Sequence, residues 1–379
     1  MKLLTRNTVL SSVDITESVH TDKATILLNQ PLAPDLDKLM DYLSGVNERA
    51  WYTNFGELHE LLTERLSHYL GVKNLLLVNN GTTALQVASK VLGGKQAWTT
   101  PYSFAATSSA LAWQGIPVDY SDVEEKTFSP NIKLMENLVD SNPSIDMIVP
   151  THIYGSPCNI DEIDELAKSR NIKVLYDAAQ SFGVNYEGKS VLSYGDASII
   201  SFHATKVFHT VEGGAICFKN NEDFLLAKQM INFGFNGAQL GPAGINGKLN
   251  EYQAAVGLTL LENMDDVLSH RINLFQRYQS NLSGHIQLQK WSPKSTYNGG
   301  YLPVVLPTGL QCQRLISILN RYGIQSRIYF KEALHRIYGR GESCAITDSL
   351  VPRVLTLPLH YHLSLNDVDK ISEIITQNV

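Results

Sequence analysis

The first 250 residues alternate short runs of apolar residues with segments whose apolar residues recur at helical spacing. The runs include LLLV at 75–78, IDMIVP at 145–150, KVLY at 173–176, ASIISF at 197–202 and AICF at 215–218. The helical segments include residues 58–70, 105–113 and 161–169. A short apolar run between turn residues predicts a strand covered on both faces, and a period near 3.6 predicts a helix. The alternation therefore predicts an α/β fold with a mostly parallel central sheet and helices on both faces.

The pattern changes after about residue 250. Apolar residues at Leu261, Met264, Leu268, Ile272 and Phe275 mark one face of a long helix. Beyond it the pattern predicts strands in YLPVVLP and IQSRIYF, and helices near residues 313–322 and 366–375. A chain of 379 residues also exceeds what one compact core usually reaches. We therefore expect a large α/β domain at 1–250, including the N-terminal segment. Residues 251–379 would form a linking helix and a small α+β domain.

Composition and charge narrow the class of protein. The chain is 44% hydrophobic with a formal net charge of −6, which excludes disorder and gives no reason to expect nucleic acid or a membrane surface as partner. The four cysteines are unclustered: Cys158, Cys217, Cys312 and Cys344. Residues 1–20 contain no apolar run of signal-peptide length, and no segment has the roughly 20 apolar residues that span a bilayer. We expect a cytoplasmic protein.

Polar residues that follow the predicted strands are the first candidates for a site, because open α/β sheets bind ligands at the carboxyl ends of their strands. Gly81, Thr82 and Thr83 follow LLLV and open a helix. Free N–H groups, hydroxyls and the helix dipole would favour a phosphate there. The alternative is that Thr82 only caps the helix.

An acid and a lysine follow two further strands. Asp177 comes directly after KVLY and could pair with a ribose hydroxyl, a metal or a protonated ring nitrogen, or could simply cap a helix. Lys206 lies in a loop after ASIISF, before Gly213 and Gly214. Most lysines are solvated, but desolvation favours the neutral amine that forms Schiff bases. A phosphate cradle, an acid and an amine together are the parts that a pyridoxal-phosphate site needs.

Several segments in order along the chain resemble the DegT/DnrJ/StrS family of nucleotide-sugar aminotransferases. They are NNGTTAL, TPYSFAATSSA, DAAQSFG, SFHATK followed by EGG, and NGKLNEYQAAVGL, and the resemblance extends from about residue 29 to 359. The family implies the aspartate-aminotransferase type of fold, pyridoxal phosphate as cofactor and a homodimer with active sites at the subunit interface.

The resemblance also implies roles for individual residues. Lys206 resembles the lysine that binds the cofactor covalently, and Asp177 the acid that keeps the ring nitrogen protonated. Gln180 is similar to the residue beside the phenolic oxygen, and Phe104 to the aromatic that stacks on the ring, although an aromatic residue is more often part of the core. The residues that resemble the phosphate contacts are Gly81, Thr82, Thr83 and Ser201. Asn246 resembles a phosphate ligand supplied by the other subunit.

The substrate side is less well specified. Many family members have an asparagine after the lysine and a TTGEGG-like run, where this chain has VFHTVE at 207–212. His209 and His360 are candidate sugar contacts, and Arg327 could bind a diphosphate or be an ordinary surface residue. His360 and His362 would share one face of a strand, but no third ligand is evident, so we predict no metal.

The implied reaction transfers an amino group, from L-glutamate by the family pattern, to a nucleotide-linked keto-sugar. The segments WYTNFGELHE and SFHATKVFHT resemble enzymes that form dTDP-4-amino-4,6-dideoxy-D-glucose, which implies dTDP-4-keto-6-deoxy-D-glucose as acceptor. Three alternatives are a 3-keto-6-deoxyhexose aminotransferase, a pyridoxal-phosphate sugar dehydratase and a cofactor-binding regulator without turnover. Dehydratases of this fold carry histidine in place of the lysine, so Lys206 opposes the second. No basic helix-turn-helix segment supports the third.

Overall fold

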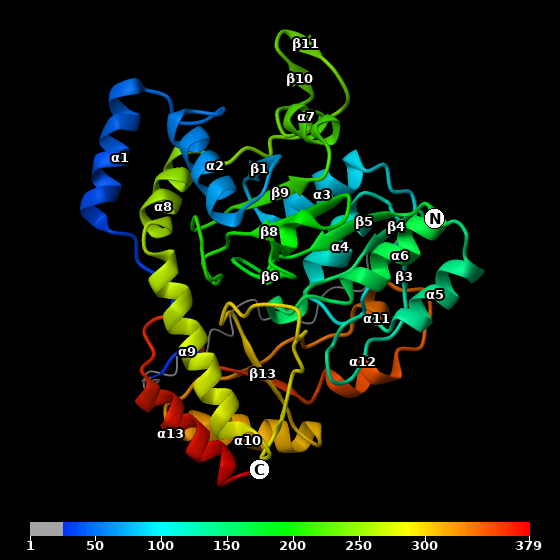
Figure 1. Cartoon of the computed structure of the whole chain (residues 1–379), viewed down its shortest axis with the longest axis vertical. Helices are drawn as coiled ribbons and strands as arrows, with labels where there is room; N and C mark the ends of the chain where they lie inside the picture. The colour runs from blue at the N-terminus through cyan, green and yellow to red at the C-terminus, as the bar shows by residue number, and fades with distance from the viewer. Residues whose placement is uncertain (1–25) are drawn as a thin grey trace, which may run out of the picture.

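A seven-stranded sheet forms the centre of the larger part of the chain in the computed structural model, which describes residues 26–379 (Figure 1). In spatial order its strands are β1 (Leu75–Val78), β9 (Gly214–Phe218), β8 (Ala197–Ser201), β5 (Lys173–Asp177), β4 (Met147–Val149), β2 (Ala97–Thr99) and β3 (Val118–Tyr120). All neighbouring pairs are parallel except the two that include β9. The predicted mostly parallel sheet is confirmed. Residues 1–20, in which we expect no signal peptide, lie outside the described residues.

Helices cover both faces of this sheet, as predicted. Neighbouring residues of a strand point to opposite faces. In β1, Leu75 and Leu77 join the core that includes residues of α2, whereas Leu76 and Val78 join the core on the side of α3. The helices around the sheet are α2 (Glu57–Leu70), α3 (Gly81–Val91), α4 (Ala105–Trp113), α5 (Ile132–Ser141), α6 (Ile160–Arg170) and α7 (Asn221–Met230). Strands buried on both faces explain why their sequences are continuously apolar.

The expected single long helix after residue 250 is two helices, α8 (Glu251–Leu261) and α9 (Met264–Leu282). The chain leaves helical geometry at Asn263, which has φ −110° and ψ 12°. The helix α8 packs against α2 and α1 (Leu36–Arg49), and α9 packs against α13 (Leu365–Thr376). Figure 1 shows the two helices running along one side of the molecule, from the seven-stranded sheet toward the C-terminal elements. The domain boundary at residue 250 stays a prediction.

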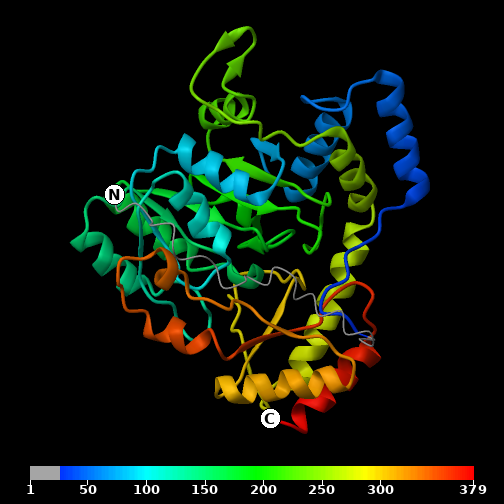
Figure 2. The ribbon, with the colours of Figure 1, turned by 180° about the vertical axis from the view of Figure 1, so that it is seen from behind.

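A second, four-stranded sheet lies in the C-terminal part of the chain. Its strands, all antiparallel to their neighbours, are β12 (Gln287–Leu288), β13 (Leu302–Val305), β15 (Val354–Leu357) and β14 (Arg327–Ile328). Its core also takes residues from α9, α10 (Gly309–Arg321) and α13. The remaining elements are η1 (Ile153–Gly155), η2 (Val191–Ser193), β6 (Asn185–Tyr186), β7 (Lys189–Ser190), β10 (Phe235–Asn236), β11 (Gln239–Leu240), α11 (Leu334–Tyr338) and α12 (Ala345–Leu350). The β10–β11 hairpin projects from the body in both whole-chain views (Figures 1 and 2).

The direction of the strands positions the site. Strands β1, β5 and β8 run parallel, so Val78, Asp177 and Ser201 all end at one edge of the sheet. The antiparallel strand β9 begins at the same edge, where Gly214 pairs with both Val78 and Ser201. None of the helices between residues 26 and 379 is long and apolar enough to span a membrane.

Candidate active site

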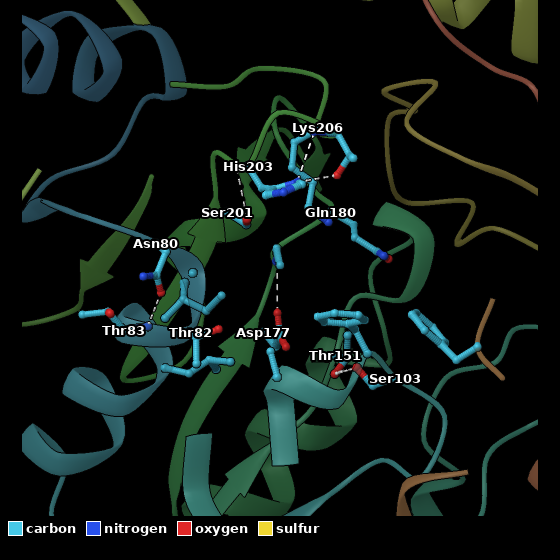
Figure 3. Close-up of a pocket in the computed structure, with 18 of the residues that line it drawn as sticks. Asn80, Thr82, Thr83, Ser103, Thr151, Asp177, Gln180, Ser201, His203 and Lys206 are labelled. Carbon is cyan, nitrogen blue, oxygen red and sulfur yellow. Dashed lines mark hydrogen bonds between the residues drawn. The ribbon is translucent and has the colours of Figure 1, made fainter. Parts of the chain in front are cut away.

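A cavity of about 740 Å³ opens at the carboxyl edge of the seven-stranded sheet. Its lining on the sheet side includes Gly81, Thr82, Thr83, Phe104, Asp177, Gln180, Ser201 and Lys206. Tyr301, Arg327, Tyr329 and Phe330 line it from the C-terminal part of the chain. Figure 3 shows Thr82 and Thr83 on one side of the cavity, Asp177 at its base and Lys206 across from them. The structure thus brings together eight of the predicted cofactor residues.

The beginning of α3 is free to receive an anion. Asn80, and not Thr82, caps this helix: its side chain accepts the Thr83 N–H at 2.8 Å. The Thr82 side chain is therefore exposed and lines the cavity. Ser201 stands beside it at the end of β8. Backbone N–H groups, two hydroxyl side chains and the positive end of a helix dipole meet at this corner, which is the donor set that a phosphate requires.

Two glycines allow the backbone to close around this corner. A Cβ on Gly81 would lie 3.0 Å from the Ser201 Cβ. A Cβ on Gly214 would lie 2.9 Å from the Asn80 carbonyl carbon and 3.0 Å from the Gly81 nitrogen. Because the contacts of Gly214 are with backbone, they cannot be relieved by a rotamer change.

Asp177 is the buried acid of the cavity, with 4% of its surface exposed. Its Oδ2 accepts the Thr107 hydroxyl at 2.7 Å, and its Oδ1 accepts the Ala179 N–H at 3.1 Å. Burial raises the pKa of Asp177, while the Thr107 hydroxyl, the Ala179 N–H and the charge of Lys206 oppose that shift. A cation placed against this carboxylate would compensate its desolvation further. The site therefore suits a protonated ring nitrogen.

Lys206 and Tyr301 approach each other across the cavity. The lysine side chain is half-buried, and its Nζ donates to the Tyr301 hydroxyl at 3.2 Å. The same Nζ lies 5.6 Å from the centre of the Tyr301 ring. Tyr301 thus holds the amine in the cavity from the opposite wall.

Phe104 and Gln180 complete the sheet side of the cavity. Phe104 precedes α4 and is 61% exposed, so it is not a core aromatic residue. Its ring centre lies 6.3 Å from that of Phe330. Gln180 accepts the Tyr154 N–H through its side-chain oxygen. The exposed face of Phe104 is available for stacking on a planar ligand.

The candidate substrate residues separate into two groups. Arg327 lines the cavity and donates to the Tyr329 hydroxyl at 3.2 Å. His209 and His360 do not line it. Both are buried, and their Nε2 atoms lie 3.0 Å and 3.1 Å from the carbonyl oxygens of Leu32 and Leu27. Burial lowers the pKa of His209, and that of His360 to about 4, so both rings are neutral near pH 7.

His360 and His362 do not share the face of a strand, whereas the expectation that Asn246 serves the other subunit stays a prediction. His360 and His362 follow β15 and are not part of it, and their ring centres are 6.2 Å apart. Asn246 is exposed and does not line the cavity of its own chain.

Sequence reasoning did not single out several residues that complete the cavity. Among them, Ser103, Thr151, Tyr301 and Tyr329 line the cavity, and Thr107, which does not line it, donates to Asp177. The segment TPYSFAATSSA contains Ser103 and Thr107, but nothing in its hydrophobic pattern marks either one among its five serines and threonines. Tyr301 precedes a strand of the other sheet, and no local signal indicates that it faces Lys206.

The fold and this site define a pyridoxal-phosphate enzyme: the donor set for a phosphate, a buried carboxylate, an amine and an exposed aromatic share one cavity. The sequence profile of the DegT/DnrJ/EryC1/StrS aminotransferase family matches residues 35–376. The chain belongs to this family, which confirms the resemblance seen in the sequence. It is a sugar aminotransferase, and its cofactor is pyridoxal phosphate.

Named relatives cover nearly the whole chain. A dTDP-4-amino-4,6-dideoxy-D-glucose transaminase of Shigella dysenteriae is 35% identical over 363 residues, which are 93% of this chain and 98% of that protein. An Escherichia coli enzyme of the same name is 32% identical over 367 residues, again 93% and 98%. The crystal structure of DesI with its TDP-sugar product superposes with a TM-score of 0.87 at 25% identity, covering 94% of each chain.

The contacts of Gly214 predict a specific defect. Gly214→Ala should displace the backbone at Asn80 and Gly81 and weaken the binding of pyridoxal phosphate about tenfold or more, since overpacking commonly costs about 1–3 kcal/mol. Fluorescence titration of the apoprotein measures the affinity. Gly45→Ala is the matched control, because its added Cβ meets only the flexible end of Arg49. Equal affinities in the two variants would show that the glycine is not needed for the cradle.

Proposed function

We propose that this enzyme transfers the amino group of L-glutamate to C4 of dTDP-4-keto-6-deoxy-D-glucose, forming dTDP-4-amino-4,6-dideoxy-D-glucose. The observation that carries the proposal is that Lys206, Asp177 and the α3 cradle line one cavity that also contains Arg327. The relatives from Shigella dysenteriae and Escherichia coli, both named dTDP-4-amino-4,6-dideoxy-D-glucose transaminase, support this acceptor.

When bound, pyridoxal phosphate would supply an aldehyde able to carry the amino group and a ring able to accept an electron pair. Lys206 would hold the cofactor covalently, and its amine, when free, would act as the base for the proton at the reacting carbon. The Tyr301 hydroxyl, 3.2 Å from Nζ, orients this amine. Asp177, as a carboxylate, would keep the proton on the ring nitrogen. Gly81, Thr82, Thr83 and Ser201, which line the cavity at the start of α3, would hold the phosphate.

Arg327 supports a nucleotide-linked substrate. It is exposed on β14 at the cavity, and its guanidinium stacks 5.7 Å from the Tyr329 ring centre. A planar guanidinium binds a diphosphate in bidentate fashion. His209 and His360 are engaged with backbone carbonyls, so we do not assign the sugar to them. A 3-keto-6-deoxyhexose is the second candidate acceptor, because a modest change of sugar pose would bring C3 to the same position.

We propose that two copies share their active sites and that Asn246 binds the phosphate in the partner. Asn246 is exposed just beyond the projecting β10–β11 hairpin, outside its own cavity. The apolar side chains of Phe233, Phe235 and Leu240 are exposed on the same projection, as at an interface between subunits. All four cysteines are free and buried, which supports our proposal that the enzyme works in the cytoplasm.

The role of Lys206 predicts both a covalent adduct and a loss of turnover. Borohydride reduction of the loaded enzyme followed by peptide mapping should place the cofactor on Lys206. Lys206→Ala should lower kcat by about 10²–10⁴-fold or more, because it removes the general base as well as the covalent anchor. Lys219→Ala, an exposed lysine after β9, should keep full activity. Cofactor attached to another lysine would contradict the assignment of every site residue.

The acceptor is tested with the two isomeric ketones. The enzyme should aminate dTDP-4-keto-6-deoxy-D-glucose with glutamate as donor, and NMR of the product should show the amino group at C4. The 3-keto isomer serves as the competing substrate in the same assay. Amination at C3 alone would favour the second candidate.

Shared sites predict that two inactive variants complement each other. Asn246→Asp places a negative charge beside the partner's phosphate, and loss of one donor to a charged group costs about 1–3 kcal/mol. Refolding Asn246→Asp together with Lys206→Ala should restore activity, because one mixed site then carries both natural residues. Asn236→Asp on the same projection should be active by itself. No recovery in the mixture would mean that each site uses only its own chain.

A further inference from the structure

Three buried hydroxyl groups form a continuous chain that ends on Asp177. Thr107, in the first turn of α4, donates to Oδ2 at 2.7 Å. Its Oγ1 lies 2.8 Å from the Ser103 Oγ, which lies 3.2 Å from the Thr151 Oγ1. The exposed fractions of Thr107, Ser103 and Thr151 are 0%, 2% and 5%. Thr107 is not part of the cavity lining, so it acts on a ligand through the residues it contacts, Asp177 and Ser103, and not directly.

The direction of this chain follows from the chemistry of its members. A carboxylate can only accept hydrogen bonds, and each hydroxyl has a single proton to donate. Because Thr107 donates its only hydroxyl proton to Asp177, Ser103 must donate to Thr107. Thr151 must in turn donate to Ser103. All three hydroxyl dipoles then point their positive ends toward the carboxylate. Hydrogen bonds aligned in this way strengthen one another.

The charge on Asp177 depends on such donors because burial opposes it. Among residues 26–379, the groups that donate to the carboxylate are the Thr107 hydroxyl and the Ala179 N–H, both neutral, and the charge of Lys206 also favours the ionised form. Of these two, the N–H belongs to the same local turn as Asp177. Thr107 lies 70 positions from Asp177 in the sequence, so its hydrogen bond forms only when α4 packs correctly against β5.

We propose that Thr107 is a positioning residue and that the chain Thr151–Ser103–Thr107 keeps Asp177 ionised and fixed in orientation. The inference rests on the proposed role of Asp177 as the partner of the ring nitrogen. If the chain is cut, the proton shared between Asp177 and that nitrogen moves toward Asp177. The nitrogen then loses positive charge, and the ring becomes a poorer electron acceptor.

The first experiment titrates Asp177 in the apoprotein, without any cofactor. The full chain is labelled with carbon-13 at the aspartate carboxyl carbons, and Asp177→Asn identifies the resonance. Thr107→Val has nearly the same shape as threonine but no hydroxyl. It should raise the titration midpoint by about one to two pH units, the size expected for one hydrogen bond to a charged group. Thr107→Ser, which keeps the hydroxyl, should leave the midpoint close to that of the unchanged chain.

A double variant separates a connected chain from independent contacts. Ser103→Ala should raise the midpoint by less than Thr107→Val does, because it removes only the second donor. In the Thr107→Val background, Ser103→Ala should change nothing further, since the connection is already cut. Equal shifts in both backgrounds would overturn the chain, as would an unchanged midpoint in Thr107→Val. If Thr107→Val does not fold, an unchanged midpoint in Ser103→Ala alone overturns it.

The loaded enzyme distinguishes this inference from the proposed role of Asp177. Pyridoxal phosphate labelled with nitrogen-15 in the ring is bound to each variant. In Thr107→Val the ring-nitrogen resonance should move from the pyridinium position toward that of neutral pyridine, and Thr107→Ser should reverse the change. A shifted apoprotein midpoint with an unmoved ring nitrogen would support the hydroxyl chain and contradict the role of Asp177.

Discussion

Asp177 ends β5 with 4% of its surface exposed, although a carboxylate is among the side chains that lose most on leaving water. The fold supplies what this residue needs from two directions. The Ala179 N–H donates to Oδ1, and the Thr107 hydroxyl, which lies in α4, donates to Oδ2. The cavity beyond offers space for a cation. Much of the geometry around the site therefore serves to stabilise the buried carboxylate of Asp177 at the end of β5 and to leave room for a cationic partner.

A buried cation fixes the opposite wall of the cavity. Arg271 in α9 is 5% exposed and donates to the backbone carbonyls of residues 299–300 and to that of Leu359. Burial lowers its pKa to about 10, which still leaves it charged at neutral pH. These bonds hold the chain just before Tyr301, whose hydroxyl contacts Lys206. The position of the amine therefore depends on a charged residue that does not itself line the cavity.

The sheet edge and the C-terminal wall of the cavity carry different kinds of binding groups. The sheet edge carries the groups suited to a phosphate, a ring nitrogen and an amine, and these do not depend on the identity of the sugar. The C-terminal wall adds Arg327, Tyr329 and Phe330, which face the remaining space. Such a division is compatible with one reaction on different substrates, because a wall built from loops and short strands can vary while the sheet stays fixed.

The sequence by itself determined the helices and strands that local hydrophobic periodicity and turn residues indicate. It predicted residues 105–113 as a helix with the bounds observed, and it indicated that Asp177 and Lys206 follow strands. Which side chains meet was decided only by the tertiary structure. The Thr107 contact with Asp177 and the contact of His209 with the Leu32 carbonyl join segments far apart in the sequence. Periodicity reports which face of an element is buried, whereas the partner of a buried polar group is set by how distant elements pack.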